Sequence, residues 1–401
     1  MKKVLDYMEA TILILSCSSV FLLTVNRDYH LTEFLIGLSF LQLLFHIFSK
    51  DFDKVKASKS IVFLLFYFAW MSIFMILNTH NTFHFLATFC ILFPLFYFRF
   101  STSKSNQTIM RILEKIPKIM CVLVFISFIF YFFGSLLNII HPNGTIVVNW
   151  DKIRTFPSYY GLHFNTQYIT LFNHNILRNT GIFPESPMYS LNLAFALGIE
   201  FFLLKKTSKF RSAAFILAIF TTTSTTGIIV MSFMILAKFL LNNSKEKNKK
   251  IYRFLFPVLL VFLFVVCGYF YLEKKQTSSY STRTDDYKAA YLAWKDHPII
   301  GNGYNDTSSI TKYMTYSRGV SNSLVVLSEG GLWLFLVYII PLIKALRYGM
   351  ERKTYRISVF GLVLLILFIT TTFQFRPILI CFLASGFALN KNDRSGIYEK
   401  I

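Results

Sequence analysis

The sequence predicts an all-α, polytopic integral membrane protein of about 12 transmembrane helices with two long exterior loops. The first observation is composition: the 401 residues are 54% hydrophobic with 46 Phe, and only 15% are charged, against roughly 25% in soluble domains. The second is that uncharged runs of about 18 or more residues recur along the chain, which is the length that a bilayer core demands of a helix. We therefore treat residues 1–401 as a single membrane domain.

Each predicted span is an apolar stretch that ends at polar or basic residues. The stretch 212–241 has basic residues on both flanks, so both of its ends lie on one side of the membrane. A single crossing cannot place them there, and we predict two short helices hinged at the polar run Thr221–Gly227. The predicted spans are 8–25, 31–48, 60–77, 82–98, 119–140, 187–204, 212–223, 226–241, 251–271, 322–343, 356–373 and 377–389.

The distribution of basic residues predicts the orientation of these spans. With the amino terminus inside, 29 of the 41 Lys and Arg residues fall in inside segments, so both termini are predicted to be cytoplasmic. The net charge of +21 is then a property of short cytoplasmic loops, and nucleic acid is not an expected partner. The 5 cysteines all fall inside predicted spans, which argues against a disulfide framework or a thiolate metal site. We predict no metal and no cofactor.

The first long exterior loop, 141–186, mixes charged and aromatic residues. Asp151, Lys152 and Arg154 lie among Phe and Tyr side chains, a pattern that suits stacking on sugars. An amphipathic helix in the membrane interface explains the same pattern equally well. The loop ends in the run Arg178–Pro187, whose arginine and carboxylate at a membrane face suggest an anion site.

The second long exterior loop, 272–321, contains a predicted helix over Ser281–Lys295. Thr282 and Asp285 resemble a capping box at its start. A guanidinium beside aromatic rings on one helix face fits a phosphate and a sugar, although an aromatic stripe is also typical of packing against lipid or neighbouring helices. The residues predicted to share this face are Arg283, Tyr287, Tyr291 and Trp294.

Five motifs follow one another along the chain in a fixed order. They are Arg178–Pro187, Ser224–Gly227, Arg283, Pro298–Gly303, and Asn322 with Glu329–Gly331. In this order, over roughly residues 170–335, the sequence resembles the O-antigen ligase and Wzy-type polysaccharide polymerase family. The resemblance implies a GT-C-like fold and a glycosyltransferase at the outer face of the bacterial cytoplasmic membrane. Such an enzyme moves a glycan from undecaprenyl pyrophosphate to a sugar hydroxyl and releases the lipid pyrophosphate.

The resemblance implies roles for individual residues. Because the leaving group carries its own pyrophosphate, arginines that hold the developing charge take the place of a metal ion. We assign this catalytic role to Arg178 and Arg283. Glu185 is either the general base for the acceptor hydroxyl or a charge that complements the following helix dipole. The candidate substrate-binding residues are Arg154, Arg318, Tyr287, Tyr291, Trp294 and Asn322.

One position departs from the pattern of the ligases. Ligases of this family typically carry a histidine just before the asparagine of the second loop, whereas this chain has Ser321 before Asn322. This difference argues for a polymerase. His163, His174 and His297 lie in the predicted exterior loops and are alternative bases.

Four carboxylates fall inside predicted spans, where a charge is costly in lipid and is therefore a functional candidate. Glu200 lies near the inner end of its span, within reach of Lys205 or Lys206. Glu329 lies deeper and either lines a cavity or bonds to a neighbouring helix. The four are Glu9, Glu33, Glu200 and Glu329.

The sequence therefore favours a polymerase of a surface polysaccharide, O-antigen or capsule, which joins undecaprenyl-pyrophosphate-linked repeat units. A glycan ligase of the same family is the nearest alternative. A lipid-linked oligosaccharide flippase or other transporter is a second, but the two halves of the sequence lack the symmetry typical of transporters. A scaffold of a synthesis complex is a third. The expected partners are the lipid-linked oligosaccharide and membrane lipid, with a chain-length regulator as a further candidate.

Overall fold

The computed structural model describes residues 2–25, 29–78, 82–104, 107–149, 153–171, 174–243, 278–315, 320 and 322–389. Within these residues, five helices are long and apolar enough to cross a membrane, and four shorter apolar helices accompany them. The structure is thus that of a multi-pass membrane protein. Twelve crossings and a GT-C-like fold remain predictions, and the predicted span 251–271 lies outside the described residues.

The amino-terminal part of the chain is helical, and its helices lie close to the predicted spans. The first is shorter than the predicted span 8–25, because the chain turns at Ser18, which has a positive φ of 61°. Two of the helices continue as π-helical turns. The elements are α1 (Lys2–Leu15), α2 (Val20–Leu23), α3 (Leu31–Ile47), α4 (Lys54–Leu77), α5 (Thr82–Phe85), η1 (Leu86–Leu92), α6 (Phe93–Ser101), α7 (Gln107–Leu113), α8 (Lys115–Ile129) and η2 (Phe130–Leu136).

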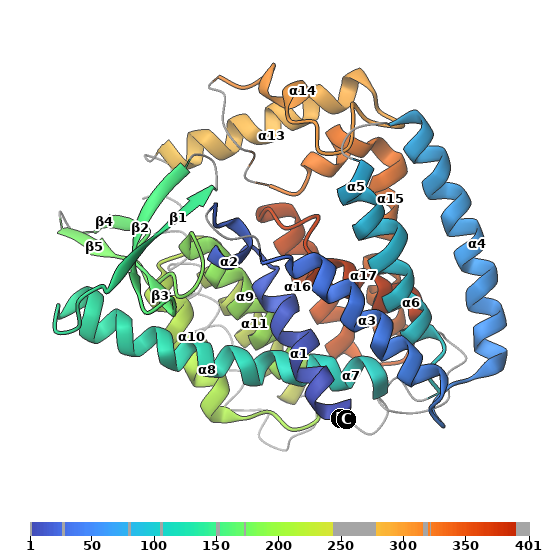
Figure 1. Cartoon of the computed structure of the whole chain (residues 1–401), viewed down its shortest axis with the longest axis horizontal. Helices are drawn as coiled ribbons and strands as arrows, with labels where there is room; N and C mark the ends of the chain where they lie inside the picture. Colours follow the sequence, from blue (N-terminus) through green and yellow to red (C-terminus); the bar gives the residue numbers. More distant parts are fainter. Residues whose placement is uncertain are drawn as a thin grey trace.

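The first long loop corrects the all-α prediction, because it folds into two antiparallel sheets rather than an amphipathic helix (Figure 1). Its strands are rich in β-branched and aromatic residues, which fit a pleated surface. Thr24 bridges to Val148, so the end of the first helical segment is fixed to this loop. The strands are β1 (Gly144–Asn149), β2 (Ile153–Tyr159), β3 (His163–Phe164), β4 (Tyr168–Leu171) and β5 (His174–Leu177), in the orders β1-β2-β3 and β4-β5.

The carboxy-terminal part returns to helices. The predicted break in 212–241 is confirmed, since one helix ends at Thr222 and the next begins at Thr225. Pro187 lies in the first turn of its helix, as predicted. The elements are α9 (Ser186–Gly198), η3 (Ile199–Leu203), α10 (Lys209–Thr222), α11 (Thr225–Asn243), α13 (Ser278–Asp296), α14 (Ser308–Thr311), α15 (Val325–Glu351), α16 (Tyr355–Thr370) and α17 (Pro377–Ala388).

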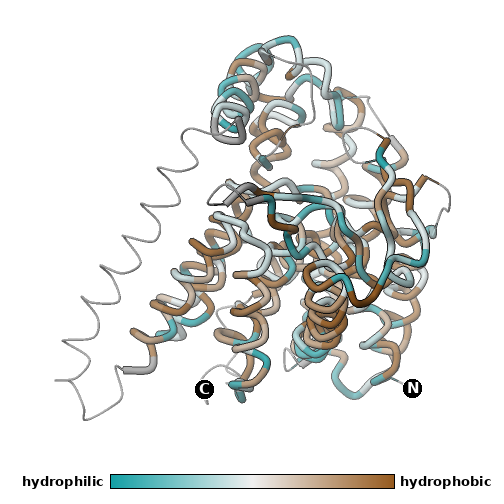
Figure 2. Tube along the Cα trace, turned by 90° about the vertical axis from the view of Figure 1, so that its left-hand side faces the viewer, coloured by the Kyte–Doolittle hydropathy of each residue, from teal (hydrophilic) through white to brown (hydrophobic). Residues whose placement is uncertain are grey.

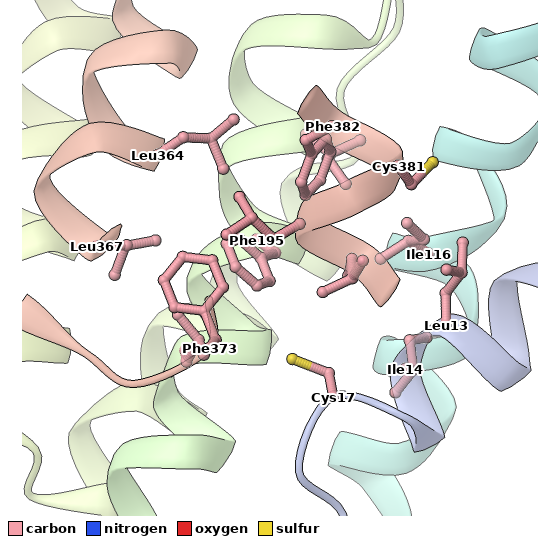
Figure 3. Close-up of a cluster of buried hydrophobic side chains, with 14 of the residues drawn as sticks. Leu13, Ile14, Cys17, Ile116, Phe195, Leu364, Leu367, Phe373, Cys381 and Phe382 are labelled. Carbon is pink, nitrogen blue, oxygen red and sulfur yellow. The ribbon is translucent and has the colours of Figure 1, made fainter. Parts of the chain in front are cut away.

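Helix α9 lies at the centre of the bundle. The apolar window of Ser186–Leu203 is 94% buried, whereas that of α4 is only 22% buried, so α4 lies at the periphery. The Phe195 ring of α9 lies 5.4 Å from that of Phe373 and 5.6 Å from that of Phe382, between α16 and α17 (Figure 3). This central helix begins directly after Arg178–Glu185, so the packed core fixes the position of that run.

Polar and apolar surfaces are separated along the molecule. Figure 2 shows hydrophobic residues along most of the bundle helices and more hydrophilic ones in the helices at the top, which Figure 1 identifies as α13 and α14. The hydrophilic α13 covers one end of the bundle, where it packs against the start of α15. That end is therefore where charged side chains from the loops meet the ends of the apolar helices.

Candidate active site

The break between α10 and α11 is a hinge of hydroxyl-bearing residues. Thr223 ends α10 in the left-handed conformation, with φ of 49°. The hydroxyls of Thr221 and Thr222 donate to carbonyl oxygens of the preceding turn, at Ala218 (2.8 Å) and Ile219 (2.6 Å). Such bonds compete with the helix ladder and favour its termination. The hinge, Thr221–Gly227, therefore ends α10 and starts α11 within a few residues.

Arg178 is held against this hinge from the first long loop. Its Nε donates to the Thr222 carbonyl oxygen and to the Thr223 hydroxyl, both at 2.9 Å. Its Nη1 donates to Oε1 of Gln167 at 3.3 Å, and the same oxygen accepts the Ser186 backbone N–H at 3.1 Å. Gln167 thus ties the guanidinium to the start of α9.

Asn179 strengthens the attachment of this run to the hinge. Its backbone N–H donates to the Thr221 carbonyl oxygen at 3.0 Å, and its side-chain amide donates to the Thr221 hydroxyl at 3.0 Å. Its Oδ1 accepts from Ser127 of α8 at 2.5 Å and from the Gly181 N–H at 3.2 Å. The run that precedes α9 is consequently rigid, and Arg178 needs no reorganisation to stay at the hinge.

Arg283 reaches the same hinge from α13. Its Nη1 donates to the Thr226 hydroxyl at 3.3 Å and to the Thr370 carbonyl oxygen at 3.5 Å. One turn later, the Tyr287 hydroxyl donates to the Ile369 carbonyl oxygen at 2.8 Å. The structure therefore brings the two predicted catalytic arginines, from two different loops, to a single segment of the chain.

The electrostatics of Arg178 are those of a partly desolvated cation. Burial lowers its pKa to about 10, and the nearby Glu185 carboxylate acts in the opposite direction. The guanidinium stays protonated at neutral pH. Its hydrogen bonds go to neutral oxygens, so its positive charge is available to an anion.

Glu185 is the N-cap residue of α9, but its side chain does not cap the helix. Gln167 accepts the Ser186 N–H instead. The carboxylate is half-buried at the helix start and lies within electrostatic range of Arg178. Both expected roles of Glu185, general base and helix-dipole charge, fit this position.

Helix α13 presents its small residues to the protein and its aromatic stripe elsewhere. Ala289 and Ala293 are buried against Ile310 and Val325. The predicted capping box is wrong, because the helix begins at Ser278, before Thr282. Asp285 accepts from the Thr315 N–H at 3.1 Å and from its hydroxyl at 2.9 Å, so it holds the following loop.

The predicted stripe on α13 divides into two parts. Arg283 and Tyr287 contact the end of α16, whereas Tyr291 is exposed and its ring lies 5.8 Å from that of Trp294, tilted by 45°. The Trp294 indole donates to the Pro298 carbonyl oxygen at 3.0 Å, which fixes the turn after the helix. Of the described hydrogen bonds of this stripe, only that of Arg283 to Thr226 reaches the hinge.

The Pro298–Gly303 and Glu329–Gly331 motifs interlock through their backbones. The Leu332 and Trp333 N–H groups donate to the carbonyl oxygens of Pro298 and Ile299, both at 2.9 Å. A Cβ on Gly301 would lie 2.3 Å from the Glu329 carbonyl oxygen, and both Gly301 and Gly331 have positive φ. These glycines are required by close backbone approach, so the two motifs position the second loop rather than react.

Glu329 belongs to this interlock, and Asn322 precedes its second motif in the chain. The Glu329 side chain, 2% exposed, accepts the Asn305 N–H at 3.1 Å, so its partner is the second long loop rather than the neighbouring helix that we expected. Asn322 is 1% exposed, and its Oδ1 accepts the Leu324 N–H at 3.0 Å. Its Nδ2 has no partner among the described residues, so it is a buried donor available to a ligand.

The remaining candidates lie away from the hinge or outside the described residues. Arg154 is exposed on β2, where it pairs across the sheet with Val148. Arg318 and Ser321 lie outside the described residues. Glu200 pairs with Arg211 at 2.9 Å rather than with Lys205 or Lys206, which corrects that expectation.

The exterior histidines have separate environments. His163 is fully buried on β3, and burial lowers its pKa to about 4, so its ring is neutral at physiological pH. His297 is exposed at the end of α13, and His174 begins β5. Among the described residues, neither His163 nor His297 forms a hydrogen bond to the hinge or to the two arginines at it.

A comparison with known proteins found a family that matches part of the chain. Residues 211–323 match the O-antigen ligase family, a segment that starts at the beginning of α10 and contains the hinge, Arg283 and Asn322. The match confirms the resemblance that the sequence motifs predict. No curated protein matches the sequence.

The structure also shows a contributor that sequence reasoning missed. Gln167 joins Arg178 to the start of α9, yet a single glutamine in a long loop carries no recognisable pattern. The contacts of Arg178 and Arg283 with the hinge threonines are tertiary and have no sequence signal either. The only part of this arrangement with a signal in the sequence was the hinge, which the polar run Thr221–Gly227 in the apolar stretch 212–241 indicated.

Proposed function

We propose that this protein is a polymerase of a surface polysaccharide at the exterior face of the bacterial cytoplasmic membrane. It transfers the glycan of one undecaprenyl-pyrophosphate-linked unit to a sugar hydroxyl of another. The observation that carries the proposal is the position of Arg178 and Arg283 at one hinge, with Glu185 within electrostatic range of Arg178. The family match supports the reaction class and a lipid-linked glycan as substrate.

The chemistry requires a charge site and a base. The acceptor hydroxyl oxygen forms a bond to the anomeric carbon of the donor, and the bond between that carbon and the pyrophosphate oxygen breaks. The leaving pyrophosphate gains negative charge, which the guanidinium groups of Arg178 and Arg283 stabilise. The hydroxyl proton passes to the Glu185 carboxylate. Attack on the face opposite the leaving group inverts the anomeric carbon.

The arginines suit this role because they are held before substrate arrives. Their hydrogen bonds to the hinge and to Gln167 fix them, so no reorganisation is needed as charge develops. Burial of Arg178 carries a desolvation cost, which the incoming pyrophosphate offsets. A hinge of neutral oxygens holds the guanidinium groups without cancelling their charge.

Ser321 before Asn322 favours the polymerase over a ligase, because ligases of this family typically carry a histidine at that position. The buried Asn322 Nδ2, which lacks a partner among the described residues, supplies a donor to a sugar hydroxyl rather than a base. The proton acceptor is then Glu185.

The test is the size profile of surface glycan in a deletion strain complemented with Arg178→Ala or Arg283→Ala. Removing one such donor is expected to slow transfer by about 10²–10³-fold, so single repeat units remain and the ladder disappears. Lys288→Ala is the matched control, since Lys288 is an exposed cation on the helix that carries Arg283. Membrane levels of each variant are measured in parallel.

Each outcome has a distinct meaning. Loss of all attached glycan, with long lipid-linked chains accumulating, identifies a ligase instead. An unchanged ladder in both arginine variants at normal protein level removes the hinge from the reaction and overturns the proposal.

A further inference from the structure

A pocket of about 200 Å³ lies at the segment 371–376, which joins α16 to α17. His84 at the start of α5 and Asn305 of the second loop complete its wall. The groups that line it are an imidazole, two amides, a hydroxyl, aromatic rings and the guanidinium of Arg376. Polar groups and rings in one concave site are the chemistry that binds a sugar.

Arg376 places a positive charge in this pocket. It is the N-cap residue of α17, with Pro377 in the first turn, so the helix start fixes its backbone. Across the described part of the chain, no carboxylate forms an ion pair with it. Burial lowers the pKa of Arg376, but a guanidinium in a protein keeps its proton.

The ionisable groups that act on Arg376 in the described structure are the Cys17 thiol and the Tyr304 phenol, and neither neutralises its charge, because a thiol and a phenol keep their protons at neutral pH. Tyr304 acts on Arg376, but burial raises the pKa of the Tyr304 phenol well above its ordinary value. The phenol is therefore neutral, and it hydrogen-bonds to Nδ1 of His84 at 2.6 Å. The pocket thus contains a cation whose neighbours are neutral, which is an electrostatic preference for an anion.

The pocket is held in shape by contacts beneath it. The Ser323 hydroxyl donates to the Thr371 carbonyl oxygen at 2.6 Å and accepts the Phe373 N–H at 3.2 Å. The Tyr338 hydroxyl donates to the Gln374 carbonyl oxygen at 2.7 Å. A segment fixed at three carbonyl or amide groups presents its side chains without rearrangement on binding.

The same segment is continuous with the hinge site. The Thr370 carbonyl oxygen accepts from Arg283, and Arg376 follows six residues later. Six residues span at most about 20 Å, a distance that a short oligosaccharide bridges. The pocket is thus placed to hold part of a glycan whose reducing end lies at the hinge.

We propose that this pocket is a glycan subsite for a sugar that carries a carboxylate, with Arg376 as its charge partner. The assignment of the occupant as glycan rests on the proposed function. A carboxylate matches the pocket better than a pyrophosphate, because the single guanidinium balances the one negative charge of a carboxylate but not the two or more charges of a pyrophosphate. The aromatic rings and neutral amides beside it fit the sugar ring rather than further phosphate charge.

The test measures ligand binding to the purified full chain by saturation-transfer NMR, with glucuronate, glucose and inorganic pyrophosphate as probes. Glucuronate is expected to bind more tightly than glucose, and Arg376→Gln is expected to weaken glucuronate binding about 10- to 100-fold while leaving pyrophosphate binding unchanged. Arg283→Ala is expected to show the reverse pattern. Lys288→Ala is the control for loss of an exposed positive charge.

The two proposals fail separately. Equal glucuronate binding in wild type and Arg376→Gln overturns the subsite, and loss of pyrophosphate binding in Arg376→Gln shows that the pocket takes phosphate instead. If Arg376→Gln does not fold, Arg376→Lys is the alternative variant, because lysine keeps the charge but lacks the planar guanidinium group. An unchanged glucuronate affinity in Arg376→Lys also overturns the subsite proposal. Glucuronate binding that depends on Arg376, together with an intact glycan ladder in the Arg178 and Arg283 variants, refutes the polymerase while retaining the pocket.

Discussion

The arginines at the two ends of the helical bundle have different partners: carboxylates at one end and neutral oxygens at the other. At one end, Arg99 pairs with Glu9 at 2.8 Å and Arg211 pairs with Glu200 at 2.9 Å. Both carboxylates are fully buried. At the other end, Arg178 and Arg283 donate only to hydroxyl, carbonyl and amide oxygens in the described structure.

We interpret this difference as one between arginines that stabilise the fold and arginines that, under the proposed function, are held for a ligand. In a buried ion pair each charge is balanced by its partner, and removing either partner leaves an uncompensated charge. An arginine bonded to neutral oxygens is held in place with its charge intact. The comparison predicts that substitutions at the first end change stability and that those at the second change function.

The largest expected effect is on glycan transfer in Glu185→Gln. If Glu185 accepts the hydroxyl proton, the amide lowers the rate of elongation by about 10²–10⁴-fold at an unchanged protein level. The measurement is ladder length in the complemented deletion strain. If Glu185 only complements the α9 dipole, the ladder persists and stability falls by about 0.3–1 kcal/mol.

At the opposite end, Glu9→Ala is expected to destabilise the fold by about 3–5 kcal/mol. Glu9 accepts from Arg99, from Ser39 at 3.1 Å and from Gln42 at 2.8 Å, so its loss leaves several buried donors without an acceptor. Thermal unfolding of the detergent-purified protein measures the effect. A wild-type melting temperature in Glu9→Ala would remove the distinction between the two ends.

Much of the helical architecture was predictable because hydropathy and basic flanks are strong local signals. The hinge at Thr221–Gly227 followed from the basic residues on both sides of 212–241 and is present in the structure. The sheets of the first loop were missed, although the Val and Ile residues of β1 are typical of strands. The mixture of aromatic and charged residues elsewhere in this loop is equally typical of a surface helix, which was the structure expected there.

The site was predictable as a set of residues but not as an arrangement. Arg178 and Arg283 were selected by motif order, whereas their meeting at the hinge depends on long-range packing of α9, α13 and α16. The glycine motifs at Gly301 and Gly331 were recognised only as members of the ordered set of motifs, and the structure shows that they form a backbone interlock. Arg376 lay in a short connector without a motif, so only the folded pocket distinguishes it.

A smaller effect is expected from His163, which makes the free energy of unfolding depend on pH. Its folded pKa, about 4, lies below the unfolded value of 6.5, so the unfolded state binds more protons between these values. The stabilisation is present above pH 6.5 and is lost as pH falls toward 4, amounting to about 2 kcal/mol between pH 7 and pH 5. The difference in melting temperature between these two pH values is therefore expected to shrink in His163→Gln. An equal difference in both proteins contradicts the prediction.

The smallest expected effect comes from Gly227→Ala, which tests how tightly the hinge packs on α9. A Cβ at this position would lie 1.7 Å from the Ser190 hydroxyl oxygen, so the serine side chain or the start of α11 must move. We expect Gly227→Ala to lower the free energy of unfolding by about 1–2 kcal/mol.

Ser190→Ala alone is expected to be close to neutral, because its buried hydroxyl has no partner among the described residues. The double variant is expected to recover most of the lost stability, since the closest contact is gone. If the double variant is as unstable as Gly227→Ala, the strain lies in the backbone of the hinge, and the arginines there depend on that backbone rather than on its packing against α9.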